Sequence, residues 1–134
     1  MAKVLVIEDD DEVTFLVRLL LEGHGHEVVV ANDGSRGFAA AQRQSPDVIV
    51  LDLMMPVMDG FAVLGALQAD DRTTDVPVVV LTALATEASQ ERCYRLGAKM
   101  VLTKPFDPSL LPGFVGEVLS GSSSSAAKRI RRLR

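Results

Sequence analysis

The chain has 134 residues, 48% of them hydrophobic, and this content supports one folded domain rather than a disordered chain. No apolar run approaches the roughly 20 residues that cross a bilayer, so the sequence predicts a cytoplasmic protein without membrane insertion. Cys93 is the only cysteine, which excludes an internal disulfide and a cysteine-based zinc cluster.

The charges are distributed unevenly along the chain. The last seven positions contain no acid and five of the 14 basic residues, namely Lys128, Arg129, Arg131, Arg132 and Arg134. The rest of the chain has nine basic and 18 acidic residues, a net charge of −9, which argues against nucleic-acid binding by the folded part. Only the basic tail could contact a nucleic acid or an acidic partner. The alternative is that the tail is a truncated linker.

Short aliphatic runs alternate with helical patterns along the chain. The first run, at residues 4–7, precedes apolar residues at helical spacing, with Asp10 or Asp11 available as N-cap and Gly23 as the end. Further runs lie at residues 28–30, 48–51, 78–81 and 100–102. They are too short for helices and continuous rather than alternating, which is typical of parallel strands buried on both faces. Helices are predicted between them at residues 34–42, 61–68 and 87–96.

This order predicts an α/β domain, a parallel sheet with helices on both faces. In the last segment, residues 110–119, Pro112, Gly113 and Gly116 interrupt the helical pattern, so this helix is expected to start late or to bend. From residue 120 the chain reads Ser-Gly-Ser-Ser-Ser-Ser. We therefore predict a domain at residues 1–119 and a flexible Ser/Gly-rich linker with its basic tail at residues 120–134.

Chemically active side chains follow four of the predicted strands. Glu8 and Asp9 follow the first, Asp52 the third, Thr82 the fourth and Lys104 the fifth. The carboxyl ends of parallel strands meet at one edge, so the carboxylates would repel one another there unless a cation neutralised them. Hard oxygen ligands suit Mg²⁺, and a carboxylate beside Mg²⁺ can attack a phosphoryl group. Asp52 fits this role best, with Lys104 and Thr82 placed to contact phosphoryl oxygens.

Each of these residues also has an ordinary structural explanation. An acid after a strand is often a helix N-cap, which is the preferred explanation for Asp10 or Asp11. Taken alone, Lys104 fits a solvated surface lysine and Thr82 fits a turn residue. Their joint occurrence at four strand ends favours a functional site over coincidence.

Four segments resemble the response-regulator receiver family of bacterial two-component systems: VLVIEDDDEV, VIVLDLMMPVMDGF, VVVLTA and LTKPF. The resemblance extends from residue 3 to about residue 119. It implies a flavodoxin-like, doubly wound sheet of five parallel strands in the order 2-1-3-4-5. It also implies phosphorelay signal transduction by a regulator that is not an enzyme, with at most intrinsic self-phosphorylation and self-dephosphorylation.

The resemblance assigns roles to individual residues. Asp52 becomes the phosphoacceptor. The phosphoryl group would come from a histidine kinase or a phosphotransfer protein. Glu8, Asp9, Asp52 and the backbone carbonyl of Met54 become the ligands of Mg²⁺.

The rest of the family's machinery carries over in the same way. Thr82 and Lys104 become the phosphoryl-contacting pair, and the Lys104–Pro105 peptide bond is expected to be cis. The downstream target would bind the face formed by the fourth helix, fifth strand and fifth helix. A homodimer is a further expectation.

Two positions depart from the family pattern. Glu8 stands where many members have Asp, but it still supplies a carboxylate, so metal binding is expected. Val101 stands where the family usually has a switch aromatic, Tyr or Phe. Because valine has no ring, inward rotation of an aromatic side chain at this position cannot report phosphorylation.

Three other functions are alternatives for a chain with this fold. A flavin-binding flavodoxin would share the fold, but the Glu-Asp-Asp-Asp loop after the first strand would repel its phosphate. A phosphatase of the aspartyl-phosphate type would need a second acid at the position of Met54. The third alternative is a protein that binds a partner without being phosphorylated. Val101 leaves this alternative open, because it lacks the ring of the usual switch residue.

Overall fold

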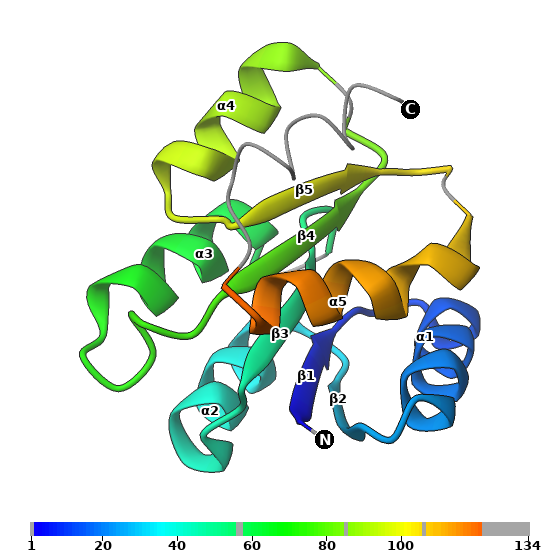
Figure 1. Cartoon of the computed structure of the whole chain (residues 1–134). Helices are drawn as coiled ribbons and strands as arrows, with labels where there is room; N and C mark the ends of the chain where they lie inside the picture. The colour runs from blue at the N-terminus through cyan, green and yellow to red at the C-terminus, as the bar shows by residue number, and fades with distance from the viewer. Residues whose placement is uncertain (1, 56–57, 85, 106, 122–134) are drawn as a thin grey trace.

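The computed structural model describes residues 2–55, 58–84, 86–105 and 107–121 (Figure 1). Residues 122–134 lie outside the described residues, and with them most of the predicted linker and the whole basic tail. The same holds for residues 56–57 and Phe106 in two of the segments that carry the family resemblance. The division of the chain at residue 119 therefore stays a prediction.

Five parallel strands form one sheet in the order β2-β1-β3-β4-β5, which confirms the predicted order. The strands are β1 (Lys3–Ile7), β2 (Glu27–Ala31), β3 (Val48–Asp52), β4 (Val78–Thr82) and β5 (Met100–Thr103). Each contains one of the aliphatic runs. Strands β3 and β4 are buried throughout their length.

Helices cover both faces of the sheet (Figure 1). One face packs against α1 (Asp11–Gly23) and α5 (Leu111–Leu119), and the other against α2 (Gly34–Gln44), α3 (Gly60–Ala69) and α4 (Glu87–Arg95). Successive strand side chains alternate between these two cores: Val4 and Val6 face α1 and α5, while Leu5 and Ile7 face the other layer. Two hydrophobic layers explain why the aliphatic runs are continuous. Among the described residues, no helix is long and apolar enough to cross a membrane.

Side-chain caps fix the starts of the helices that surround the sheet. The Asp10 carboxylate accepts a hydrogen bond from the backbone N–H of Glu12 at 2.9 Å, so the capping role predicted for Asp10 or Asp11 belongs to Asp10. Asp33, Asp59 and Thr86 cap α2, α3 and α4 in the same way. These caps fix where each helix begins after the loop at the carboxyl end of its strand.

The last helix starts late, as its proline predicted. A 3-10 turn, η1 (Pro108–Leu110), leads into α5 at Leu111, so Pro112 lies in the first turn. A helix needs no backbone N–H there, because the first four N–H groups have no partner within the helix. The helix continues through Gly113 and Gly116 to Leu119, where it packs on the sheet beside α1.

Candidate functional site

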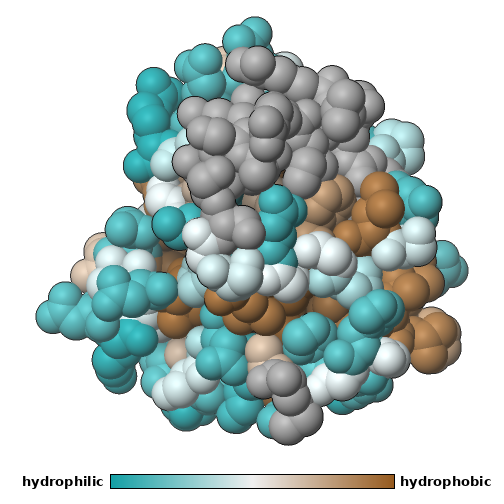
Figure 2. Space-filling view, in the orientation of Figure 1, coloured by the Kyte–Doolittle hydropathy of each residue, from teal (hydrophilic) through white to brown (hydrophobic). Residues whose placement is uncertain are grey.

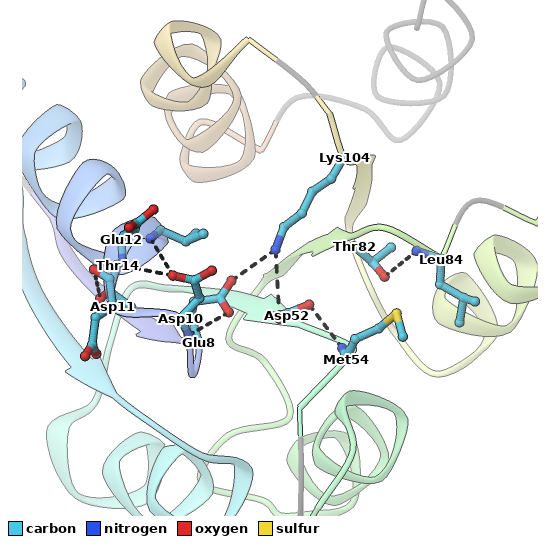
Figure 3. Close-up of polar contacts among 11 residues, drawn as sticks. Glu8, Asp10, Asp11, Glu12, Thr14, Asp52, Met54, Thr82, Leu84 and Lys104 are labelled. Carbon is cyan, nitrogen blue, oxygen red and sulfur yellow. Dashed lines mark hydrogen bonds and ion pairs between the residues drawn. The ribbon is translucent and has the colours of Figure 1, made fainter.

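The predicted functional side chains gather at one edge of the sheet (Figure 3). Glu8 follows β1, Asp52 ends β3, Thr82 ends β4 and Lys104 follows β5. Parallel pairing in register, with Asp52 opposite Leu81 and Thr82 opposite Thr103, brings these strand ends to the same level. Glu8 and Lys104 are 96 positions apart in the sequence, yet their side chains lie in the same site.

Three carboxylates form the acidic part of the site. One oxygen from each of Glu8, Asp9 and Asp52 lies within 4.8 Å of the other two. Glu8 and Asp52 are buried, at 3% and 5% exposure, and Asp9 is exposed. Buried like charges repel strongly, and three hard oxygen donors open to solvent on one side suit a small divalent cation. The residues present therefore fit Mg²⁺.

Lys104 is the cation of the site. Its Nζ donates a hydrogen bond to Oε1 of Glu8 at 3.2 Å and lies 3.9 Å from Oδ2 of Asp52. In Figure 3 its side chain extends from the end of β5 and reaches the gap between the two carboxylates. The Lys104–Pro105 peptide bond is cis, as the family resemblance predicted.

The environment of Glu8 changes its acidity. Burial, and to a lesser extent a hydrogen bond with Asp52 and repulsion from its carboxylate, together raise the pKa of Glu8 to about 7, against the opposing effect of Lys104. Glu8 therefore holds a proton for part of the time at neutral pH when no metal is bound.

Backbone N–H groups orient the two central side chains. The N–H of Met54 donates to Oδ1 of Asp52 at 3.0 Å, and the N–H of Leu84 donates to the hydroxyl oxygen of Thr82 at 2.9 Å. Each side chain is thus held by the second residue of its own loop, as in Asx and ST turns. The sequence did not reveal these contacts, because any residue except proline supplies the N–H.

Tyr94 is a residue that the sequence reasoning missed. Val101 is fully buried in the core on the side of the sheet that α4 covers, and Tyr94 of α4 packs against the same core. The backbone N–H of Val101 donates to the Tyr94 hydroxyl oxygen at 3.2 Å. Tyr94 of α4 therefore contacts Val101, which stands where the family usually has its switch aromatic. The one available signal is that the single tyrosine lies in the helix directly before β5.

Comparison with known proteins gives the family. The model of the response regulator receiver domain matches residues 4–115. The chain belongs to this family. The match confirms the resemblance of the four segments and assigns the chain to phosphorelay signal transduction, in a family of regulators rather than classical enzymes.

Individual relatives agree with this. PilH of Pseudomonas aeruginosa is 35% identical over 121 residues, which are 90% of this chain and 100% of PilH. The chain spans only about half the length of several curated transcriptional regulators that it also matches.

Solved receiver structures have the same fold. Chemotaxis protein CheY4 of Vibrio cholerae superposes with a TM-score of 0.83 at 34% identity, covering 88% of this chain and 98% of that one. The receiver domain of the sensor histidine kinase PA1611 of Pseudomonas aeruginosa superposes with a TM-score of 0.80 at 29% identity, covering 90% and 98%. The latter structure has a magnesium ion coordinated in its active site cleft. These neighbours confirm the flavodoxin-like fold.

Proposed function

We propose that Asp52 is the residue of this receiver domain that takes a phosphoryl group from a histidine kinase or phosphotransfer protein. The observation that carries the proposal is the burial of the Asp52 carboxylate beside a cation, Lys104, and an acidic cluster that fits Mg²⁺. In the transfer, a carboxylate oxygen of Asp52 bonds to phosphorus while the phosphorus–nitrogen bond to the donor imidazole breaks. The product on the protein is an acyl phosphate.

The acidic cluster is the proposed metal site. Glu8, Asp9, Asp52 and the backbone carbonyl of Met54 would hold Mg²⁺, and the magnesium in the cleft of the related kinase receiver supports this assignment. When bound, the ion supplies positive charge that offsets the repulsion between a phosphate and a carboxylate. Glu8 must lose its proton to act as a ligand, so metal binding should release that proton.

Lys104 and Thr82 are proposed to stabilise the phosphorylated state. Lys104 needs only to turn from Glu8 toward a new phosphoryl oxygen, because its Nζ already lies 3.9 Å from Asp52. The Thr82 hydroxyl accepts from Leu84, so its hydrogen can be donated to another phosphoryl oxygen. Hydrogen bonds to charged groups contribute roughly 1.5–3 kcal/mol each, enough to move a balanced equilibrium between two conformations.

The phosphodonor protein is proposed to contact α1. Helix α1 begins at the site's edge of the sheet, and its Phe15 and Leu19, one turn apart, are 70% and 58% exposed. Figure 2 shows brown, apolar surface at the right, where this helix lies, beside hydrophilic residues. A donor that brings an imidazole to Asp52 must cover the rim of the site, where such a surface favours contact with a protein.

The output surface is proposed to be the edge formed by α4, β5 and α5. Strand β5 carries both Lys104 at its end and the backbone N–H that Tyr94 of α4 binds, so a movement at the site reaches α4 directly. Receiver domains interact with kinases and downstream effectors. Use of this particular face, a homodimer, contact of the basic tail with an acidic partner or nucleic acid, and a cytoplasmic location are further parts of the proposal.

Beryllofluoride, which mimics a phosphoryl group on a carboxylate, tests the proposed function. In the presence of Mg²⁺ it should shift the amide signals of Asp52, Thr82 and Lys104 and leave those signals unchanged when Mg²⁺ is omitted. The same titration on Asp52→Asn should show no shift. A protein that only binds a partner would give no response in either case, and that result would exclude phosphorylation at this site.

A further inference from the structure

A second surface lies between the outer edge of β2 and helix α2. It is a groove of about 470 Å³. Its lining combines the last part of β2 with one side of α2, chiefly Val29, Val30, Arg36, Ala39, Ala40 and Arg43. The proposed phosphoryl transfer uses none of these residues.

Part of the β2 backbone faces outward into this surface. Among the described strands, β2 pairs with β1 alone, and on that side the Glu27 N–H donates to the carbonyl of Ala2 while the carbonyl of Ala31 accepts from the N–H of Glu8. Backbone groups alternate along a strand, so those of Val28 and Val30 point away from the sheet. The Arg18 guanidinium donates to the carbonyl of Val28 at 3.4 Å. Within the described ranges, no hydrogen bond satisfies the outward N–H and carbonyl of Val30.

The groove is positively charged although the body of the chain is acidic. Arg36 and Arg43 are separated by two turns of α2, about 10 Å along the helix axis. Arg36 pairs with Asp33 at 3.6 Å, and the Arg36 side chain is 76% exposed while that of Asp33 is 32% exposed. Arg43 has no ion pair with any described residue, and Lys3 adds an ammonium group near it by donating to the carbonyl of Gln44. The floor between the arginines is apolar.

We propose that this groove binds an extended segment of a partner protein in which acidic and apolar side chains alternate. The segment adds to the sheet as a strand, pairing with the outward N–H and carbonyl of Val30. Side chains on one side of an added strand face α2, where acids meet Arg43 and Arg36 and form charge-assisted hydrogen bonds. Main-chain pairing provides the affinity, and the arginines select acidic segments.

Charge argues against the two other occupants. Two copies of the chain joined antiparallel through β2 would have both α2 helices on the same side of the continuous sheet. Arg36 and Arg43 of one copy would then face the same residues of the other, a costly juxtaposition of like charges. The chain's own residues 128–134 are also basic and are repelled in the same way.

The test uses the whole chain and a fluorescein-labelled peptide of alternating valine and glutamate. Fluorescence anisotropy should show binding of this peptide, and the matched peptide with lysine in place of glutamate should not bind. Arg43→Glu should weaken binding by about tenfold or more. Arg95→Glu, the same change at an exposed arginine of α4 outside the groove, should leave affinity unchanged, as should Asp52→Asn. Amide exchange at Val30 should slow when the glutamate peptide is bound.

Several results would overturn the proposal. Absence of binding by the glutamate peptide would do so, and so would equal affinity for the lysine peptide. If Arg43→Glu and Arg95→Glu weakened peptide binding equally, binding would depend only on the overall charge of the protein and not on the groove. If sedimentation shows a dimer that Val30→Pro abolishes, the edge of β2 binds a second copy of the chain instead.

Discussion

Lys104 lies closer to Glu8 than to Asp52: its Nζ is 3.2 Å from the Glu8 carboxylate and 3.9 Å from that of Asp52. The lysine that is expected to contact the phosphoryl group is therefore held by the neighbouring acid before transfer. Glu8 is buried, and its pKa is raised to about 7 even with this partner. The site without metal is consequently strained by charge, and several measurable properties follow from this.

The stability of the metal-free protein should fall as the pH rises from about 5 to about 8. Folding raises the pKa of Glu8 from 4.5 to about 7, so in this window the folded chain binds more protons than the unfolded chain. Stability that depends on such a group is complete below the unfolded pKa and is lost as the pH rises through the folded one. The loss should be at most about 3 kcal/mol, measured by urea unfolding in the presence of a chelator.

Glu8→Gln is the matched control for this pH dependence. Glutamine fills the same space and does not titrate, so its unfolding free energy should change much less over the same pH range. Mg²⁺ should bind more tightly to the wild type at pH 8 than at pH 6, because the proton and the metal compete for Glu8. Parallel pH profiles for wild type and Glu8→Gln would contradict the raised pKa of Glu8.

Phosphorylated protein should lose its phosphate slowly. Met54 and Leu84 follow the phosphoacceptor and the threonine by two residues, and in Figure 3 Met54 lies beside Asp52 and Leu84 lies beyond Thr82. Neither apolar side chain can orient an attacking water as an amide or carboxylate could, and both are expected to hinder its approach to the acyl phosphate. Combining Met54→Asn with Leu84→Glu should speed phosphate loss by about tenfold or more, equivalent to roughly 1.4 kcal/mol of barrier. An unchanged rate of loss in Mg²⁺, followed by intact-protein mass, would refute this explanation.

Tyr94 should couple α4 to β5. Its hydroxyl accepts from the backbone N–H of Val101, so beryllofluoride should shift the amides of both elements together in the wild type. Tyr94→Phe keeps the ring and removes the hydrogen bond. This variant should lose about 0.5–1.5 kcal/mol of stability and should exchange the Val101 amide faster. Its α4 amides should respond less to beryllofluoride than those of the wild type, whereas an undiminished α4 response would show that the hydroxyl carries no coupling.

Much of the fold could be predicted because burial imposes a visible pattern on the sequence. Residues 48–51 are aliphatic on both sides of β3, since each side meets a layer of helices, and such a run suits a buried parallel strand. The late start of α5 could be predicted from Pro112, because proline has no backbone N–H and fits only the first turn of a helix. The gathering of Glu8, Asp52, Thr82 and Lys104 followed from topology, because parallel strands end at one edge.

Other features depend on geometry that side-chain identity does not encode. The preference of Lys104 for Glu8 over Asp52 is a difference of less than an ångström. The contact of Tyr94 with Val101 uses a backbone N–H, which every residue except proline supplies. The open edge at Val30 depends on which side of β2 faces β1, and this alternation is set by strand pairing.

The central claim is that Asp52 is the phosphoacceptor, and mapping the phosphoryl group after treatment with acetyl phosphate tests it most directly. In Mg²⁺ the wild type should gain the mass of one phosphoryl group, and borohydride reduction should locate the acyl phosphate at Asp52 in peptide mass spectra. A chelator should suppress the labelling while the protein stays folded, and Asp52→Asn should remain unlabelled because an amide cannot form an acyl phosphate. Stoichiometric labelling of Asp52→Asn at the wild-type rate would contradict the assignment and place the phosphoacceptor elsewhere in the chain.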